Sequence, residues 1–325
     1  MARLSLSLCS RAVCLLAASA MLLCGMACRH HEPPTVMVIT PTGGMEYWAA
    51  FVRAARSGAG AAGIRIEVAA PQSVTSYTEQ AQMVDNAIER HVQGIIVAPA
   101  HQLVLASVLQ KAVRNKIPVV IVGSPIALSA KDFSAFVGWD EEEAGRLAAR
   151  RFVTLLGGKG EVGVVGVSPT VESSSLIEKA FAEEIARSPR IKLVGVKYGL
   201  SDWARSRQST LDLVAEHPNI KGILTTDEFS THAADVAFDH YGRNRPWLIG
   251  VSDESFELNG LRDGHIDALV VSEPQELGMR AMQAMRAALA NGDASAYSAK
   301  LPVSIVDAKS MGANPVVSSL LLNAN

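Results

Sequence analysis

Short apolar runs alternate with longer amphipathic stretches along most of the chain. Residues 35–40 (TVMVIT), 94–98 (GIIVA) and 118–122 (PVVIV) are continuously apolar and do not alternate with polar residues. Continuous runs of this kind are typical of strands in a parallel sheet that helices cover on both faces. The stretches between them, such as residues 75–91, place their apolar residues on one face of a helix. The pattern therefore predicts repeated βα units.

The same pattern continues to residue 306. It predicts strands at residues 35–40, 64–69, 94–98, 118–122, 135–138, 161–167, 191–197, 222–225, 247–251, 267–271 and 302–306. It predicts helices at about residues 46–62, 75–91, 103–115, 141–156, 174–187, 203–216, 229–241, 256–262 and 275–290. So many strands exceed the usual width of one open sheet. We therefore expect two doubly wound parallel sheets within the 325 residues.

The first 28 residues differ from the rest of the chain. They contain Arg3 and Arg11, no acidic residue, and the apolar run 12–23 (AVCLLAASAMLL). This run is shorter than the roughly 20 residues that a membrane-spanning helix needs. A basic start, a short apolar centre and small residues at the end predict a secretory signal peptide. Residues 25–28 (GMAC) resemble a bacterial lipobox, with Gly where the motif usually has Leu. Lipidation at Cys28 is therefore expected, and plain cleavage nearby is the alternative.

Composition narrows the function classes. All four cysteines lie in the first 28 residues, so the mature chain has no disulfide framework, thiol nucleophile or thiolate metal site. A hydrophobic content of 49% excludes a disordered chain, and a net charge of −2 gives no general attraction for nucleic acid. Residues 29–34 (RHHEPP) are interpreted as a short tether. No nucleophile–base motif is visible, so we predict neither an enzyme nor a cofactor or metal site.

Polar and aromatic residues follow several predicted strands. Ligands bind beyond the carboxyl ends of the strands in open α/β sheets. Hydroxyls and carboxylates suit a polyhydroxylated ligand, and an aromatic ring can stack on its C–H surface. Asp227 could accept hydrogen bonds from two neighbouring hydroxyls, or it could only cap the helix that follows. The run 140–143 (DEEE) is interpreted as a helix cap with first-turn acids rather than as a metal site.

The order and spacing of several segments resemble the type I periplasmic sugar-binding proteins, the ribose-binding-protein family. These segments, between residues 35 and 309, are VMVITPTGGMEYWAAFVRAA, QGIIVAPA, KIPVVIVGS, AFVGWDEEEAGRLAARRF, ILTTDEFSTHAADVAF, LIGVSDESFELNGLRDGHIDALVVSEPQELG and LPVSIVD. The resemblance implies an α/β fold of two Rossmann-like doubly wound parallel-sheet lobes joined by three hinge crossovers. It places the crossovers near Gly138, residues 273–274 and residues 301–303. Lobe one would comprise residues 35–137 and 275–301, and lobe two residues 138–273 and 302–315, followed by a tail at 316–325.

Carried over position by position, the resemblance implies a partly altered ligand site. Tyr47 and Trp48 match the family's paired aromatics, and Met45 stands where the family has an asparagine before them. Most of the family's charged or amide positions are replaced. Gly123 and Ser124 stand where the family has an Asp-Arg pair, and Ser175 stands where it has an arginine. Asp227 takes the place of an asparagine, Ser252 (beside Asp253) that of an aspartate, and Ser272 that of a glutamine. Trp203 is the candidate aromatic residue of lobe two.

The resemblance also implies a function. It suggests an exported monomer that captures a small polar ligand, a sugar or polyol, by hinge closure. The protein would deliver this ligand to the membrane permease of an ABC importer. A receptor that signals to a membrane partner is the alternative function, and a nucleoside is the alternative ligand. DNA-binding repressors share this core, but they need an N-terminal helix-turn-helix where this chain has its signal segment.

Overall fold

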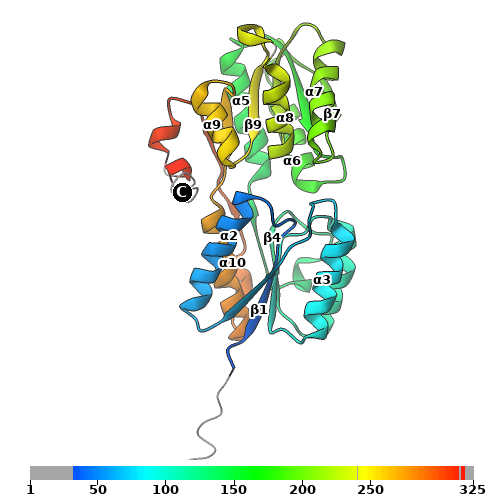
Figure 1. The fold of residues 1–325 in the computed structure, drawn as a ribbon, viewed down its shortest axis with the longest axis vertical. Coiled ribbons are helices and arrows are strands. Elements are labelled where there is room, and N and C mark those ends of the chain that lie inside the picture. Colours follow the sequence, from blue (N-terminus) through cyan, green and yellow to red (C-terminus); the bar gives the residue numbers. More distant parts are fainter. Residues whose placement is uncertain (1–31, 240, 315, 319–325) are drawn as a thin grey trace, which may run out of the picture. The chain divides into compact units, whose positions relative to one another are not determined.

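The computed structural model describes residues 32–239, 241–314 and 316–318. The predicted signal peptide, including Cys28, lies outside the described residues. From Pro34 onward the chain folds as one compact unit. This unit contains two sheets, each with its own helices (Figure 1). The predicted α/β class with two parallel-sheet lobes is confirmed.

The first sheet and its helices form lobe one. Its strands have the order β11-β5-β4-β3-β1-β2, and all neighbouring pairs are parallel. Their bounds are β1 (Thr35–Ile39), β2 (Arg65–Ala69), β3 (Gly94–Val97), β4 (Val119–Gly123), β5 (Ala135–Trp139) and β11 (Ala299–Leu301). The helices are α2 (Glu46–Gly60), α3 (Tyr77–Glu89), α4 (Gln102–Arg114) and α10 (Pro274–Leu289).

The second sheet and its helices form lobe two. Its strand order is β12-β10-β9-β8-β6-β7, and only β12 runs antiparallel to its neighbour. Their bounds are β6 (Gly160–Gly166), β7 (Ile191–Tyr198), β8 (Ile220–Thr225), β9 (Trp247–Val251), β10 (Ala268–Val271) and β12 (Ser304–Val306). The helices are α5 (Glu141–Leu155), α6 (Glu172–Ile185), α7 (Trp203–Glu216), α8 (Glu228–Phe238) and α9 (Ser255–Asp263).

Each sheet has a hydrophobic core on both of its faces. In β1, Val36 and Val38 pack toward α2 and α10, whereas Met37 and Ile39 pack toward α3 and α4. Successive side chains of a strand point to opposite faces, so a strand covered on both sides must be apolar throughout. This explains the continuous apolar runs. Full burial of such a side chain is worth about 1.5–3 kcal/mol.

The chain passes between the two sheets three times. It leaves the first sheet after β5, returns between β10 and α10, and crosses again between β11 and β12. Gly138 and Trp139 pair within the first sheet, although the division by resemblance placed residue 138 onward in lobe two. None of the described helices is long and apolar enough to cross a membrane.

The observed elements lie close to the predicted ones, with two differences near the end of the chain. The short strand β11 was not predicted, because it has only three residues and its centre is the polar Lys300. The strand predicted at 302–306 begins only at Ser304, since the preceding residues form the last crossover.

Candidate functional site

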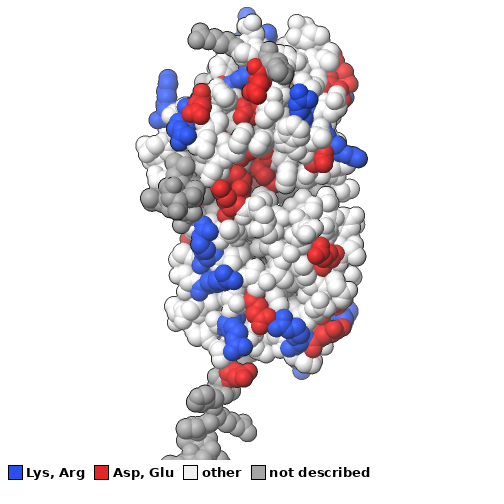
Figure 2. Space-filling model, in the orientation of Figure 1, with Lys and Arg blue, Asp and Glu red and all other residues white. Residues whose placement is uncertain are grey.

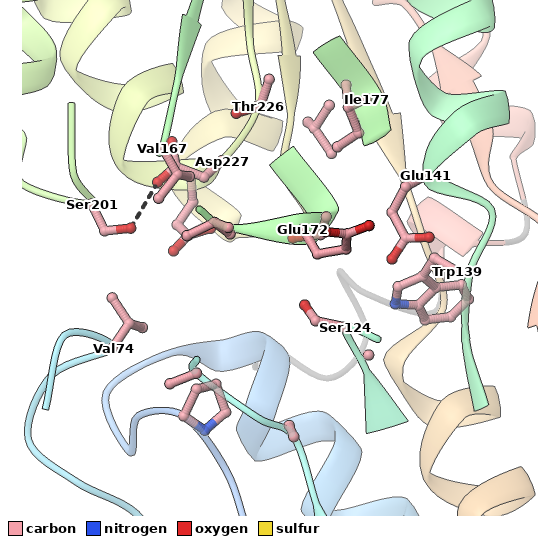
Figure 3. A pocket seen from close by; sticks show the side chains of 18 of the residues that line it. Val74, Ser124, Trp139, Glu141, Val167, Glu172, Ile177, Ser201, Thr226 and Asp227 are labelled. Carbon is pink, nitrogen blue, oxygen red and sulfur yellow. Dashed lines mark hydrogen bonds between the residues drawn. The ribbon is translucent and has the colours of Figure 1, made fainter. Parts of the chain in front are cut away.

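A cavity of about 560 Å³ lies where the carboxyl ends of both sheets meet. In lobe one its lining comes from the ends of β1, β2, β3, β4 and β5 and the segments after them, and in lobe two from those of β6, β7, β8, β9 and β10. Figure 3 shows side chains from both lobes pointing into this space. This is the edge at which parallel α/β sheets bind ligands, because the loops that leave the strands converge there.

Lobe one supplies the aromatic side chains of the cavity, which we call the aromatic wall: Tyr47, Trp48, Tyr77 and Trp139. Tyr47 and Trp48 lie in the first turn of α2 and contact each other edge to face, with ring centroids 4.8 Å apart. The Trp139 indole N–H donates to the Tyr47 hydroxyl at 2.6 Å. This bond fixes two rings of the wall relative to each other.

The backbone turns sharply at the end of β4, beside the aromatic wall. Gly123 ends the strand with a φ of +72°, a conformation that residues with a Cβ rarely adopt. A Cβ at this position would lie 3.5 Å from the Trp48 ring. Glycine therefore permits the turn that brings Ser124 and Pro125 to the cavity.

Lobe two supplies the carboxylates of the cavity, which we call the acidic wall: Glu141, Glu172, Asp227, Glu228, Asp253 and Glu254. Hydroxyls stand among them, from Ser168, Thr170, Ser173, Ser201, Thr226, Ser252 and Ser272. No lysine or arginine is found among the described residues that line the cavity. On the face of the molecule that Figure 2 shows, acidic side chains gather at the level where the two lobes meet.

Asp253 is held in place by the residue that follows β10. Its carboxylate accepts hydrogen bonds from the Ser272 backbone N–H at 2.7 Å and from the Ser272 hydroxyl at 2.5 Å. Burial raises the pKa of Asp253 to about 7, although the Ser272 hydrogen bonds lower it. Burial and the nearby Asp253 charge also raise the pKa of Tyr47, so this phenol stays protonated.

Asp227 both caps a helix and lines the cavity. Its carboxylate accepts from the Ser230 backbone N–H at 3.0 Å, and its own backbone N–H donates to the Ser230 hydroxyl oxygen at 3.3 Å, which makes a capping box at the start of α8. The Ser201 hydroxyl donates to the other carboxylate oxygen at 3.4 Å (Figure 3). Burial raises the pKa of Asp227. The capping role considered from the sequence is thus present, and a role in ligand binding stays a prediction.

Glu141 is the least exposed residue of the acidic wall. It opens α5, is only 6% exposed and lies beside Trp139 at the cavity (Figure 3). Its carboxylate makes no hydrogen bond or ion pair with another described side chain. Burial raises its pKa to about 7. The sequence interpretation of residues 140–143 is confirmed, because Asp140 caps α5 by accepting from the Glu143 N–H at 2.9 Å and the three glutamates lie in the first turn of the helix. That interpretation missed that Glu141 faces the cavity.

Two helix starts, one from each lobe, meet beside the cavity, and each binds a carboxylate from the other lobe; we call this arrangement the reciprocal clasp. The Glu254 carboxylate of lobe two accepts from the backbone N–H groups of Glu46 and Tyr47 at 3.1 and 2.9 Å. The Glu46 carboxylate of lobe one accepts from the backbone N–H and hydroxyl of Ser255 at 3.1 and 2.5 Å. Free N–H groups at a helix start are natural anion sites, so each carboxylate stabilises the other lobe's helix.

Most of the residues predicted from the sequence line the cavity: Met45, Tyr47, Trp48, Ser124, Asp227, Ser252, Asp253 and Ser272. Ser175 and Trp203 do not. Helix α6 begins at Glu172, two residues earlier than predicted, and the Ser175 hydroxyl donates to the Pro169 carbonyl. Trp203 opens α7 and is 42% exposed outside the cavity.

Several lining residues were missed from the sequence. Trp139 ends β5, Glu141 comes two residues after it and Ser201 three residues after β7, so the rule that ligands bind beyond strand ends could have found them. Glu172 carries a weaker signal, because it opens α6, six residues after the end of β6. Glu172 accepts from the Gln102 side-chain amide of lobe one at 3.4 Å.

Comparisons with known proteins agree with this fold. Residues 36–294 match the periplasmic binding protein domain family, and the chain belongs to this family. It is 23% identical over 231 residues to the D-apiose import binding protein of Actinobacillus succinogenes, covering 70% of this chain and 73% of that protein. It is 20% identical over 255 residues to the D-allose-binding periplasmic protein of Escherichia coli, covering 76% and 82%.

The fold also matches solved structures. A solute-binding protein of an ABC transporter from Agrobacterium vitis, bound with alpha-D-tagatopyranose, has a TM-score of 0.82 to this chain. The match is 20% identical and covers 88% of this chain and 98% of that one. The likeness therefore establishes a shared fold across nearly the whole described chain.

Proposed function

We propose that this protein is an extracytoplasmic solute-binding protein of an ABC importer and that its ligand is a small sugar or polyol. The observation that carries the proposal is a single cavity that both lobes line, with aromatic rings on one side and hydrogen-bond acceptors on the other. The relatives named above carry sugar-binding or sugar-import names, which supports the same ligand class.

The two walls suit the two kinds of surface on a sugar. A pyranose or furanose ring presents C–H groups that pack on aromatic faces such as Trp48. Its hydroxyls donate to carboxylates, which accept at two oxygens each. A cavity of about 560 Å³ falls within the usual range for small-molecule sites, which is roughly 300–1,000 Å³.

Ligand capture would work by closure of the lobes. A ligand that contacts both walls favours the arrangement in which both walls reach it, and the three crossovers between the sheets provide the hinge. The reciprocal clasp and the Gln102–Glu172 contact would close with the cavity, since each joins one lobe to the other. The closed form would then be the species that the membrane permease recognises.

Export and membrane attachment belong to the same proposal. Members of a periplasmic family act outside the cytoplasm, and the first 28 residues carry the features of a signal peptide. A lipid on Cys28 would hold the monomeric protein at the membrane, where the permease is. Mass spectrometry of the mature N-terminus tests this: we expect an acylated Cys28, and an unmodified N-terminus would contradict it.

The function is tested by a thermal-shift screen of sugars and polyols, both neutral and amino-substituted. A ligand present at 100 times its Kd should stabilise the fold by about 2.7 kcal/mol. Small-angle scattering with the best ligand should show a smaller radius of gyration. Failure of every sugar and polyol to raise the melting temperature would contradict the proposed ligand class, and an unchanged radius would contradict closure.

A further inference from the structure

The acidic wall has no counter-charge within the cavity. Six carboxylates line it, and the described lining residues contain no lysine or arginine. Like charges that share a poorly solvated space repel each other, and their charge is unfavourable without a partner of opposite sign. Hydroxyl groups of a neutral sugar could supply hydrogen bonds to these carboxylates, but they could not supply the missing positive charge.

Most of these carboxylates already have protein donors. Glu254 accepts from the start of α2, Asp253 from Ser272, and Asp227 from Ser230 and Ser201. Glu172 accepts from Gln102. Glu141 and Glu228 differ, because neither has a donor from another described side chain, and Glu141 is the less exposed of the two, at 6%. A buried carboxylate without a partner that faces a cavity is a feature that a bound ligand would complete.

The surroundings of Glu141 fit an ammonium group. The Trp139 ring lies beside the carboxylate (Figure 3), and its indole N–H is already donated to Tyr47. An aromatic face next to a carboxylate attracts an organic cation by both charge and the ring quadrupole. The described residues contain no group of three His, Cys, Asp or Glu side chains that could hold a metal ion, so a metal is not the cation that these contacts favour.

We propose, on the basis of the function proposed above, that the cavity binds a polyhydroxylated ligand carrying one positively charged amino group, an amino sugar or amino-polyol, and that Glu141 forms the ion pair with its ammonium. The hydroxyls of the ligand then meet the remaining carboxylates, and its C–H face packs on the aromatic wall. A neutral analogue leaves Glu141 without an ion pair, because Lys300, whose charge lowers the pKa of Glu141, pairs with Glu142.

Binding of matched ligands tests the charge directly. Calorimetry would compare D-glucosamine, D-galactosamine and D-mannosamine with D-glucose, D-galactose and D-mannose, and with the three N-acetylated forms, which keep the nitrogen but lose the charge. The cationic imino sugar 1-deoxynojirimycin and the neutral pentoses would complete the set. We expect at least one cationic member to bind about 10- to 100-fold more tightly than its neutral partners, the range for a hydrogen bond to a charged group.

Two variants assign this preference to Glu141. Glu141→Gln should lower the affinity for the cationic ligand by about 10- to 100-fold. The affinity for its neutral partner should stay within about threefold, because the substitution removes only the charge. Glu142→Gln is the matched control. This substitution removes one charge from the same helix turn, but Glu142 pairs with Lys300 and does not line the cavity. This control should bind both ligands like the parent protein.

The outcomes separate this inference from the function on which it rests. A neutral sugar that binds as tightly as its amino counterpart would overturn the inference and leave the sugar-binding function intact. Equal losses for charged and neutral ligands in Glu141→Gln would also overturn it, because they would show a structural role. If neither neutral nor cationic members bind, the inference and the proposed ligand class both fail.

Discussion

The two lobes line the cavity with different kinds of side chain. The lining of lobe one contains every aromatic residue of the cavity and no carboxylate, whereas the lining of lobe two contains all six carboxylates and no aromatic side chain. Stacking on a ring depends little on which substituents a ligand carries, while a carboxylate distinguishes hydroxyl, ammonium and carbonyl groups. Lobe one is therefore expected to set affinity in general, and lobe two to set which ligand is chosen.

The largest expected effect is on the aromatic wall. Trp48→Ala should weaken the tightest ligand of the sugar panel by about 100-fold, because an indole loses roughly 3 kcal/mol of buried apolar contact. Neutral and charged ligands should lose affinity alike, as measured by calorimetry. Trp48→Phe is the matched control and should recover most of the binding. If Trp48→Ala binds within threefold of the parent protein, or loses only one ligand class, the division between the walls is wrong.

The next test concerns the acidic wall. Asp227→Asn should lower affinity by about tenfold, the lower end of the range for a charged hydrogen bond. The asparagine can still accept from the Ser230 N–H, so the cap of α8 is kept and the melting temperature should change little. A variant that melts earlier but binds within twofold would show that Asp227 acts only as a cap.

The reciprocal clasp tests whether the two walls act together. Glu46→Ala removes the acceptor for both Ser255 donors. The affinity for every ligand should fall by about fivefold, because one contact between the lobes worth about 1 kcal/mol is lost. Most of this loss should appear as faster dissociation in stopped-flow measurements. Glu67→Ala is the control, since its exposed ion pair with Arg90 lies within lobe one. Unaltered dissociation in Glu46→Ala would remove the clasp from the closure mechanism.

The smallest expected effect is the dependence of the melting temperature on pH, and it should come from carboxyl groups of lobe two. Burial raises the pKa of Glu257 to about 8 and that of Glu141 and Asp253 to about 7. The folded state therefore holds protons that the unfolded chain releases above about pH 4. This contribution to stability is complete below pH 4 and is lost as the pH rises to 8. The ligand-free protein should melt at a lower temperature at pH 8 than at pH 5.

Glu257→Gln sharpens this pH prediction. The glutamine can still accept from the Ser252 hydroxyl but does not ionise, so the difference in melting temperature between pH 5 and pH 8 should shrink by roughly 2–4 °C. Calorimetric scans at both pH values measure it. A parent protein that melts at the same or a higher temperature at pH 8 would contradict the raised pKa values.

Local sequence was sufficient to predict most of the elements. A strand such as β1 is covered on both faces, so its consecutive residues must all be apolar, and this run is visible in the local sequence. The caps at Asp140 and Asp227 are equally local, since each carboxylate bonds to the N–H three residues later. The site residues that were predicted also follow strands directly, so a rule about strand ends was enough to bring Tyr47 and Asp253 to one edge.

Only the tertiary structure decided how these residues divide between two walls. In the sequence, Glu141 is one of four consecutive acids, and nothing local distinguishes it from Glu142; in the fold one is 6% exposed at the cavity and the other pairs with Lys300. Ser175, which the family resemblance placed in the site, lies outside the cavity in the first turn of α6, where its hydroxyl donates to the Pro169 carbonyl. Burial and electrostatic surroundings depend on segments far apart in the chain, so the sequence by itself determined the strands, helices and caps, while the fold determined which charges are left without a partner.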